Sequence, residues 1–218
     1  MTQAVSHKKN ILTAGWLLAL SALVGTGLMS IVNWHSEPYI AVNEEQFLLR
    51  SLNSVISENS YNNNILNDTT YLDDKLLGNT EPTIAYRARL GEQPVAAALT
   101  VVTENGYNGE IVLLVGIDFS GKVTGVRVVK HRETPGLGDG IEIKRSNWIE
   151  TFIGRSLKNP LGQGWKVKRD GGEFDQFTGA TITPRAVVGA VHNALLFFNK
   201  NKKNIFNQST LVNKDNQE

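Results

Sequence analysis

An uncharged apolar run near the start of the chain limits the folds open to it. Residues 11–32 read ILTAGWLLALSALVGTGLMSIV and contain no Asp, Glu, Lys, Arg or His. At about 1.5 Å per residue, a helix of this length spans roughly 33 Å, which is enough to cross the hydrocarbon core of a bilayer. We therefore predict a transmembrane helix over residues 11–32.

The charges beside this run predict its orientation. Lys8 and Lys9 precede it, whereas Trp34 and Glu37 follow it. Because positive charge stays on the cytoplasmic side, residues 1–10 are expected to form a cytoplasmic N-terminus in contact with membrane lipid, and the rest of the chain to face outward. A cleaved signal peptide is the alternative, but the apolar core is longer than a typical signal core and no clear A-x-A site follows it.

Composition excludes several classes of function. The chain has 22 Lys and Arg against 21 Asp and Glu, so no basic field is available to attract nucleic acid. It contains no cysteine, which removes disulfides, thiolate catalysis and cysteine-ligated iron–sulfur clusters. The four histidines are scattered and show no metal-ligand spacing, so we expect no metal site.

The outward part reads as a helical connector followed by a sheet. Helical spacing of apolar residues from Glu44 to Ile56 precedes an Asn-rich stretch that should end the helix, and residues 33–82 are assigned to this connector. Short runs rich in branched residues follow, separated by Gly-Glu, Asn-Gly and Ser-Gly turns, and predict an antiparallel meander with strands at 83–90, 94–102, 110–118 and 122–130.

A Gly- and Pro-rich loop, HRETPGLGDG, comes after the meander. We expect a helix through Trp148 and Phe152, a short strand at 164–168, and a final helix with apolar residues on one stripe. The fold class is thus α+β, with a transmembrane helix followed by a domain over residues 83–200 in which helices pack on an antiparallel sheet. Residues 201–218 are polar and are predicted to form a flexible tail.

The last helix has a distinctive start. Thr183 followed by Pro184 predicts a capped helix, whose unpaired N–H groups can receive a phosphate. Thr181 lies just ahead of that helix end, and Gly179 and Ala180 leave its hydroxyl sterically open. On these residues alone, an ordinary loop leading into a capped helix remains the simpler interpretation.

The segment D-x-x-T-G-A-T, residues 175–181, resembles the flavinylation motif of bacterial FMN-binding domains. In that family the last threonine is joined to the FMN phosphate by a phosphoester bond. The resemblance implies that Thr181 carries one covalent FMN, with Asp175, Thr178, Gly179 and Ala180 beside it. The family often has serine in place of Thr178. Asp175 either caps a turn or helps to present Thr181 to an FMN transferase.

A second segment, ETPGLG at residues 133–138, resembles the flavin-contacting loop of the same family and follows His131. By resemblance, Glu133, Thr134, Leu137 and Gly138 contact the flavin, and Leu137 could cover a ring face. Without the family, this loop is simply a surface turn. We expect Glu133 to orient the flavin or restrain its reduction rather than act as a base, and we expect no catalytic residue in a protein that only relays electrons.

Further similar stretches lie at residues 106–118, 146–154 and 170–191. They make the chain similar to the G subunits of Rnf ion-translocating electron-transport complexes, with the C subunits of sodium-pumping NADH:quinone reductases as the alternative. The resemblance implies a periplasmic domain on the bacterial inner membrane. It also implies partners among the A, B, C, D and E subunits of Rnf, chiefly D and the integral-membrane A and E, with an FMN transferase acting during maturation.

Such a complex couples electron transfer between NADH and ferredoxin to Na⁺ or H⁺ movement. A membrane-tethered assembly module without cofactor is the alternative from another class, but it leaves the two ordered motifs unexplained. A hydrolase using Thr181 lacks a GxSxG elbow.

Overall fold

The computed structural model describes residues 2–78 and 80–208, and the side chains of 2–14, 36–42 and 44 lie outside that description. It divides into two compact units, Met1–Leu48 and Leu49–Glu218. The predicted flexible tail therefore lies outside the described residues from 209 onward, as do the side chains of Lys8, Lys9 and Glu37, on which the predicted orientation depends.

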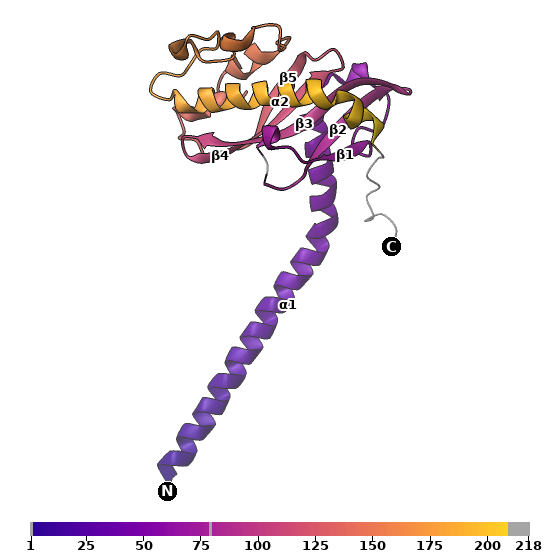
Figure 1. Cartoon of the computed structure of the whole chain (residues 1–218). Helices are drawn as coiled ribbons and strands as arrows, with labels where there is room; N and C mark the ends of the chain where they lie inside the picture. The colour runs from indigo at the N-terminus through magenta and orange to yellow at the C-terminus, as the bar shows by residue number, and fades with distance from the viewer. Residues whose placement is uncertain (1, 79, 209–218) are drawn as a thin grey trace. The chain divides into compact units, whose positions relative to one another are not determined.

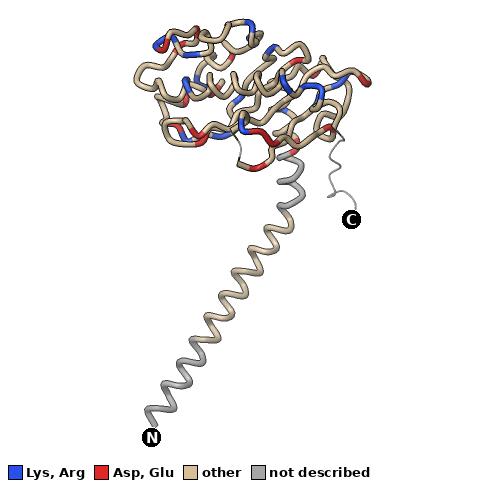
Figure 2. Tube along the Cα trace, viewed as in Figure 1, with Lys and Arg blue, Asp and Glu red and all other residues tan. Residues whose placement is uncertain are grey.

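The first unit is helical. Helix α1 runs over Thr2–Asn53, and its last residues belong to the second unit (Figure 1). Gly15–His35 is long and apolar enough to cross a membrane, and none of it is buried. Figure 2 shows no charged residue along this stretch. The described chain thus has one N-terminal apolar helix, which is consistent with a single membrane anchor.

The second unit contains a five-stranded antiparallel sheet in the order β1-β2-β3-β4-β5. Its strands are β1 (Thr69–Leu72), β2 (Thr83–Leu90), β3 (Gln93–Gly106), β4 (Gly109–Asp118) and β5 (Val123–Lys130). The meander is confirmed, and tight turns join its four long strands. Strand β1 was not predicted, because four residues reading TTYL carry too little alternation to be recognised.

One face of the sheet packs against the second long helix, α2 (Ile182–Asn207), which lies across it in Figure 1. Strand side chains alternate between faces, so Ala97, Leu99 and Val101 join the core under α2. The stripe Val187, Val191, Leu195 and Phe198 supplies the helix side of that core. The α+β architecture is confirmed.

The opposite face of the sheet is covered by the residues that follow α1. Gly116 and Gly125 pair across β4 and β5, and a Cβ at either would lie within 2.7 Å of Val55 backbone atoms. The Thr124 hydroxyl donates to the Val55 carbonyl at 2.5 Å. These glycines are required because the chain after α1 runs directly against the sheet.

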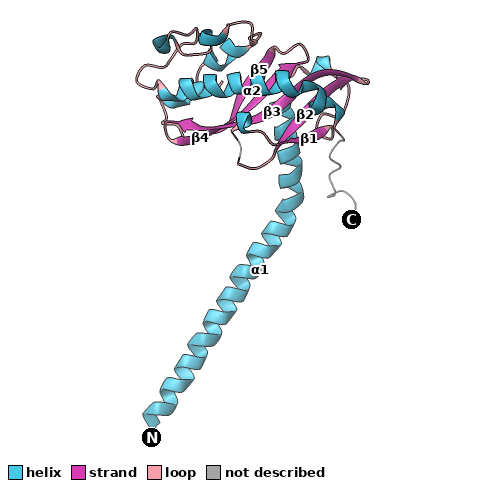
Figure 3. Cartoon of the chain, viewed as in Figure 1, coloured by secondary structure: helices cyan, strands magenta, loops and turns pink. Residues whose placement is uncertain are grey.

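The segment between β5 and α2 contains short 3-10 helices and isolated β-bridges but no strand (Figure 3). The expected helix through Trp148 is a 3-10 helix over Asn147–Phe152, and the expected strand at 164–168 is reduced to a single bridge from Val167 to Phe174. The other 3-10 helices are Glu58–Ser60, Lys75–Leu77, Gly138–Ile141, Gly162–Gly164 and Lys168–Asp170. Helix α2 continues past residue 200 to Asn207, because Ile205 and Phe206 are buried.

Candidate functional site

Thr181 occupies the N-cap position of α2. A turn precedes Thr181. In this turn Gly179 has φ +81°, and the Ala180 amide donates to the Phe177 carbonyl at 3.1 Å. Thr181 itself has φ −77° and ψ −27°, and its side chain makes no capping hydrogen bond in the described structure. A threonine at an N-cap ordinarily accepts a hydrogen bond from a helix amide through its side-chain oxygen. Because Thr181 makes no such bond, its hydroxyl is available to another group.

The predicted helix start at Thr183-Pro184 is two residues too late. Helix α2 begins at Ile182, and the hydroxyl of Thr183 donates a short hydrogen bond to Glu133 Oε2 instead of capping the helix. Both groups are buried, and a buried carboxylate needs donors from within the protein. This long-range partner overrides the local capping preference.

Glu133 joins three segments of the chain. Its Oε2 accepts from Thr183 on α2, and its Oε1 accepts from the amide of Asn108, at 3.0 Å, in the turn between β3 and β4. Only 4% of the residue is exposed. Both carboxylate oxygens are therefore already engaged inside the protein, and the structure shows Glu133 fixing the geometry of this region.

The loop after β5 lies next to the start of α2. A Cβ at Gly138 would lie 2.9 Å from both Glu133 Oε2 and Thr183 Oγ1, so only glycine fits there without displacing that hydrogen bond. Leu137 is 48% exposed, and its Cδ2 lies 3.7 Å from where a Cβ of Gly179 would be. The fold thus brings the ETPGLG loop and the TGAT turn together at one surface.

Asn108 is a site residue that the sequence analysis missed. Its side-chain amide donates to Thr134 Oγ1 at 3.1 Å, in addition to the backbone bond to Glu133. In the sequence it stands in an Asn-Gly pair, which we interpreted as a turn, within the family-like stretch 106–118. Through these two hydrogen bonds, the turn between β3 and β4 holds the loop that follows β5 in place.

His131 is held in one tautomer. Its Nδ1 accepts the Glu133 amide at 3.0 Å, so the ring proton is assigned to Nε2, which lies 2.6 Å from Glu142 Oε1. His192 is remote from this arrangement. It stacks on Trp165 with ring centroids 5.3 Å apart, and burial lowers its pKa, as expected for a packed side chain.

The remaining predicted residues lie at the edge of the site. Asp175 pairs with Lys168 Nζ at 2.6 Å, both side chains being largely exposed, while its backbone carbonyl accepts from Trp148 Nε1 at 2.8 Å. Trp148 is buried in the core. Thr178 is exposed. The Asp175 carboxylate is thus engaged by Lys168 and caps no turn in the described structure.

An ion pair stands one helical turn beyond Thr181. Arg185 donates to Asp170 through Nε at 2.6 Å and Nη2 at 2.9 Å. This hydrogen-bonded pairing lowers the pKa of Asp170 and raises the pKa of Arg185.

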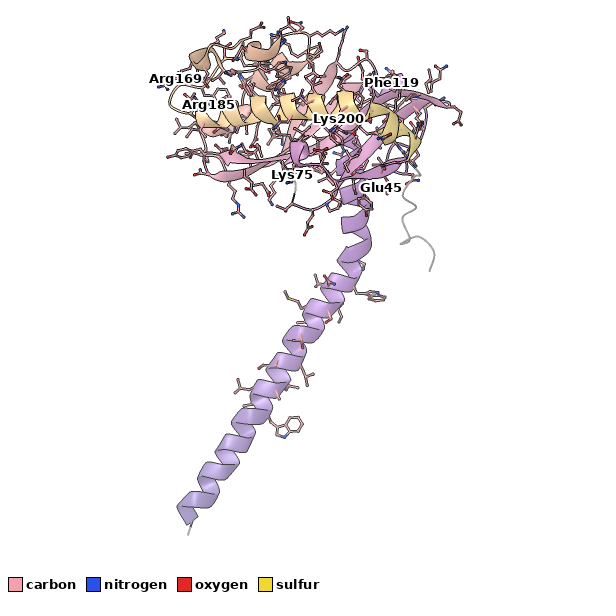
Figure 4. All side chains as sticks on the ribbon, viewed as in Figure 1. Glu45, Lys75, Phe119, Arg169, Arg185 and Lys200 are labelled. Carbon is pink, nitrogen blue, oxygen red and sulfur yellow. The ribbon has the colours of Figure 1, made fainter. Side chains whose placement is uncertain are left out.

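Arg185 also lines a groove of about 620 Å³ between the N-terminal half of α2, the end of β3 and the turn Lys75–Leu77. Arg185 and Lys75, both labelled in Figure 4, line this groove from α2 and from the turn Lys75–Leu77. Gly189 lines the same groove from the middle of α2, and a Cβ there would meet nothing within 4 Å.

Comparison with known proteins finds two family matches. Residues 106–196 match the FMN-binding domain, and residues 1–55 match the RnfG N-terminal region. The G subunit of the ion-translocating oxidoreductase complex of Shewanella baltica is 46% identical over 200 residues, covering 91% of this chain and 94% of the relative.

Two further relatives bear the same description. The G subunit of Pseudomonas aeruginosa PAO1 is 46% identical over 199 residues, covering 91% of this chain and 93% of the relative. That of Vibrio cholerae is 44% identical over 194 residues, covering 89% and 93%. Similarity therefore extends over nearly the whole of each chain.

Proposed function

This chain belongs to the family of G subunits of Rnf ion-translocating oxidoreductase complexes, and we propose that it relays electrons there through one FMN joined to Thr181 by a phosphoester bond. The observation that carries the proposal is the state of the Thr181 hydroxyl, which stands at a helix N-terminus without a capping bond. The positive end of the helix and its unpaired amides favour a phosphate at that place.

The surrounding residues fit such a group. Gly179 and Ala180 leave the backbone accessible, and Leu137 presents an exposed apolar surface beside Gly179 that could cover a flavin ring. Gly138 and Thr134 belong to the loop that the fold holds against the start of α2. Glu133 supports this loop from within, and we propose that Thr178 and Asp175 flank the attachment point.

Bound FMN supplies one- and two-electron redox chemistry, while the polypeptide holds the ring and sets its surroundings. In the attachment reaction, the Thr181 oxygen bonds to the phosphorus of an activated flavin phosphate. The leaving group departs with the electron pair of the broken P–O bond, and the hydroxyl proton passes to a base on the FMN transferase. A covalent link prevents loss of the cofactor to the space outside the cytoplasm.

Location follows from the anchor. We propose that Gly15–His35 spans the bacterial inner membrane with Lys8 and Lys9 on the cytoplasmic side, which leaves the FMN-binding domain in the periplasm. There it would exchange electrons with the D subunit and the integral-membrane A and E subunits, in a complex that also contains B and C and couples NADH and ferredoxin electron transfer to Na⁺ or H⁺ movement.

Two threonines three positions apart give a matched test. We expect the chain expressed with an FMN transferase to fluoresce in an SDS gel, Thr181→Ala to abolish the band, and Thr178→Ser to retain it, because Thr178 is exposed and the family often has serine there. A Thr181→Ala protein that kept its flavin through SDS would contradict the attachment site. A cofactor-free assembly module predicts unmodified mass and no fluorescent band for every variant.

A further inference from the structure

Arg185, which pairs with Asp170, lies four residues after Thr181, in the first turn of α2. Residues four apart share one helix face, and helical side chains lean toward the N-terminus. The Arg185 amide also donates to the Thr181 carbonyl at 3.3 Å. Figure 4 labels Arg185 at the beginning of α2, with Arg169 on the adjoining turn. The guanidinium thus belongs to the first turn of α2, four residues beyond Thr181, where it is paired with Asp170.

Asp170 fixes the orientation of this guanidinium. It belongs to the turn Lys168–Asp170 and receives both Nε and Nη2 of Arg185, in the fork geometry that restricts an arginine most strongly. Nη1 has no hydrogen-bond partner within the described residues, and the Arg185 side chain is 50% exposed. A rigidly held cation therefore retains donors that face solvent.

A cation of this kind would stabilise a phosphoester at Thr181. The phosphoester keeps one full negative charge, whereas a helix N-terminus offers only partial positive charge. Arginine binds phosphate oxygens through charge-assisted hydrogen bonds and remains charged at every physiological pH. Arg185 is the helix residue that combines one-turn spacing from Thr181 with a fixed guanidinium and unused donors.

We propose that Arg185, oriented by Asp170, is the positioning residue for the flavin phosphate at Thr181. It holds the phosphate during attachment and afterwards in the flavoprotein. The inference rests on the proposed attachment at Thr181 and adds to it a charged partner for the phosphate. Because the ion pair is exposed, its removal should leave the fold intact.

The test compares four variants of the full chain, each incubated with an FMN transferase and its flavin donor. Attachment is followed by intact mass, and the phosphoester is then examined by ³¹P NMR. We expect Arg185→Ala to slow attachment about tenfold, the loss expected for one charge-assisted hydrogen bond. Arg185→Lys should restore most of the rate, and Asp170→Asn should give an intermediate rate because the guanidinium loses its support.

Arg169→Ala is the matched control, since it removes a positive charge that also acts on Asp170 without touching the ion pair. We expect its rate and ³¹P shift to equal those of the unsubstituted chain, whereas Arg185→Ala shifts the resonance. Unfolding midpoints of all unmodified variants should agree.

Two results would overturn the inference while leaving attachment at Thr181 intact. One is an unchanged rate in Arg185→Ala. The other is a slower rate with an unchanged ³¹P resonance, which would mean that Arg185 serves only recognition by the transferase. An unsubstituted chain that never acquires flavin would instead refute the proposed function itself.

Discussion

Two arginines donate hydrogen bonds to the carbonyls at the C-terminal end of α2, which we call the closed end. At the N-terminal end, which we call the open end, the Thr181 hydroxyl makes no capping bond. Arg87 donates through Nη1 to the carbonyls of Ile205 and Gln208 at 3.0 and 2.7 Å, and Arg89 donates to that of Phe206 at 2.8 Å. Asp68 accepts from both arginines at 2.6 and 2.7 Å.

The residues at the C-terminal end of α2 thus contribute to stability, whereas we assign the N-terminal end to the proposed phosphate attachment. Carbonyls at a helix end need donors, and cations there also interact favourably with the helix dipole. The amides at the opposite end have the same need, yet no threonine oxygen is used on them. An uncapped end costs about 1 kcal/mol and keeps both the amides and the Thr181 oxygen available for a phosphate.

The largest expected effect comes from breaking the closed end. Arg87 is fully buried, so Arg87→Ala leaves helix carbonyls without donors and Asp68 with one cation fewer. We expect a loss of about 3–5 kcal/mol in the free energy of unfolding, measured in urea through tryptophan fluorescence. Arg155→Ala removes the more exposed pair with Glu173 and should cost under about 1 kcal/mol. Equal losses in Arg87→Ala and Arg155→Ala would show that the hydrogen bonds of Arg87 to the end of α2 add no particular stability.

The interior of the open end should come second. Thr183→Val keeps the shape of the side chain but leaves Glu133 Oε2 without its donor in a buried place. The expected cost is about 1–3 kcal/mol by the same urea measurement. Thr178→Val, at an exposed position of the preceding turn, should change stability by less than about 0.5 kcal/mol. A neutral Thr183→Val would mean that Glu133 does not depend on this bond.

A gain is expected in the groove beside the open end. Gly189→Ala places a Cβ where no atom lies within 4 Å, so the variant should gain about 1 kcal/mol from helix propensity alone. Gly138→Ala should instead destabilise, because its Cβ would lie 2.9 Å from Glu133 Oε2. Thermal unfolding distinguishes the two signs, and destabilisation by Gly189→Ala would show that the groove is not open.

The smallest effect on stability should come from Thr181 itself. Its side chain caps nothing, so Thr181→Ala should alter the unfolding free energy of the unmodified chain by less than about 0.5 kcal/mol. The measurement is urea unfolding of chains produced without an FMN transferase. A loss of about 1 kcal/mol or more would indicate that Thr181 is an ordinary helix cap and would remove the contrast between the two ends.

Sequence patterns predicted the elements whose formation depends on neighbouring residues in the chain. The four long strands follow from branched residues between turn pairs, and α2 follows from its apolar stripe. The apolar spacing around Trp148 could not distinguish a 3-10 helix from an α-helix. The Lys- and Asn-rich end of α2 looked like a tail because its stability depends on Arg87 and Arg89, which come from a distant strand.

The site was predictable in its motifs but not in its connections. Both motifs could be recognised from the sequence, and the fold brings them near each other, with Leu137 Cδ2 3.7 Å from where a Cβ of Gly179 would lie. The engagement of Glu133 by Asn108 and Thr183 could not be predicted, because it joins residues far apart along the chain. Because the Thr183 hydroxyl is bonded to Glu133, Thr183 does not cap the helix as predicted, and Thr181 occupies the N-cap position instead.

Peptide mass spectrometry tests directly whether the Thr181 oxygen carries FMN. The complex is isolated from its native host, this chain is digested, and the peptide that contains residues 175–185 is fragmented. We predict a mass increase equal to FMN minus water, located on Thr181. An unmodified Thr181, or the same increase on Thr178 or Thr183, would contradict the account.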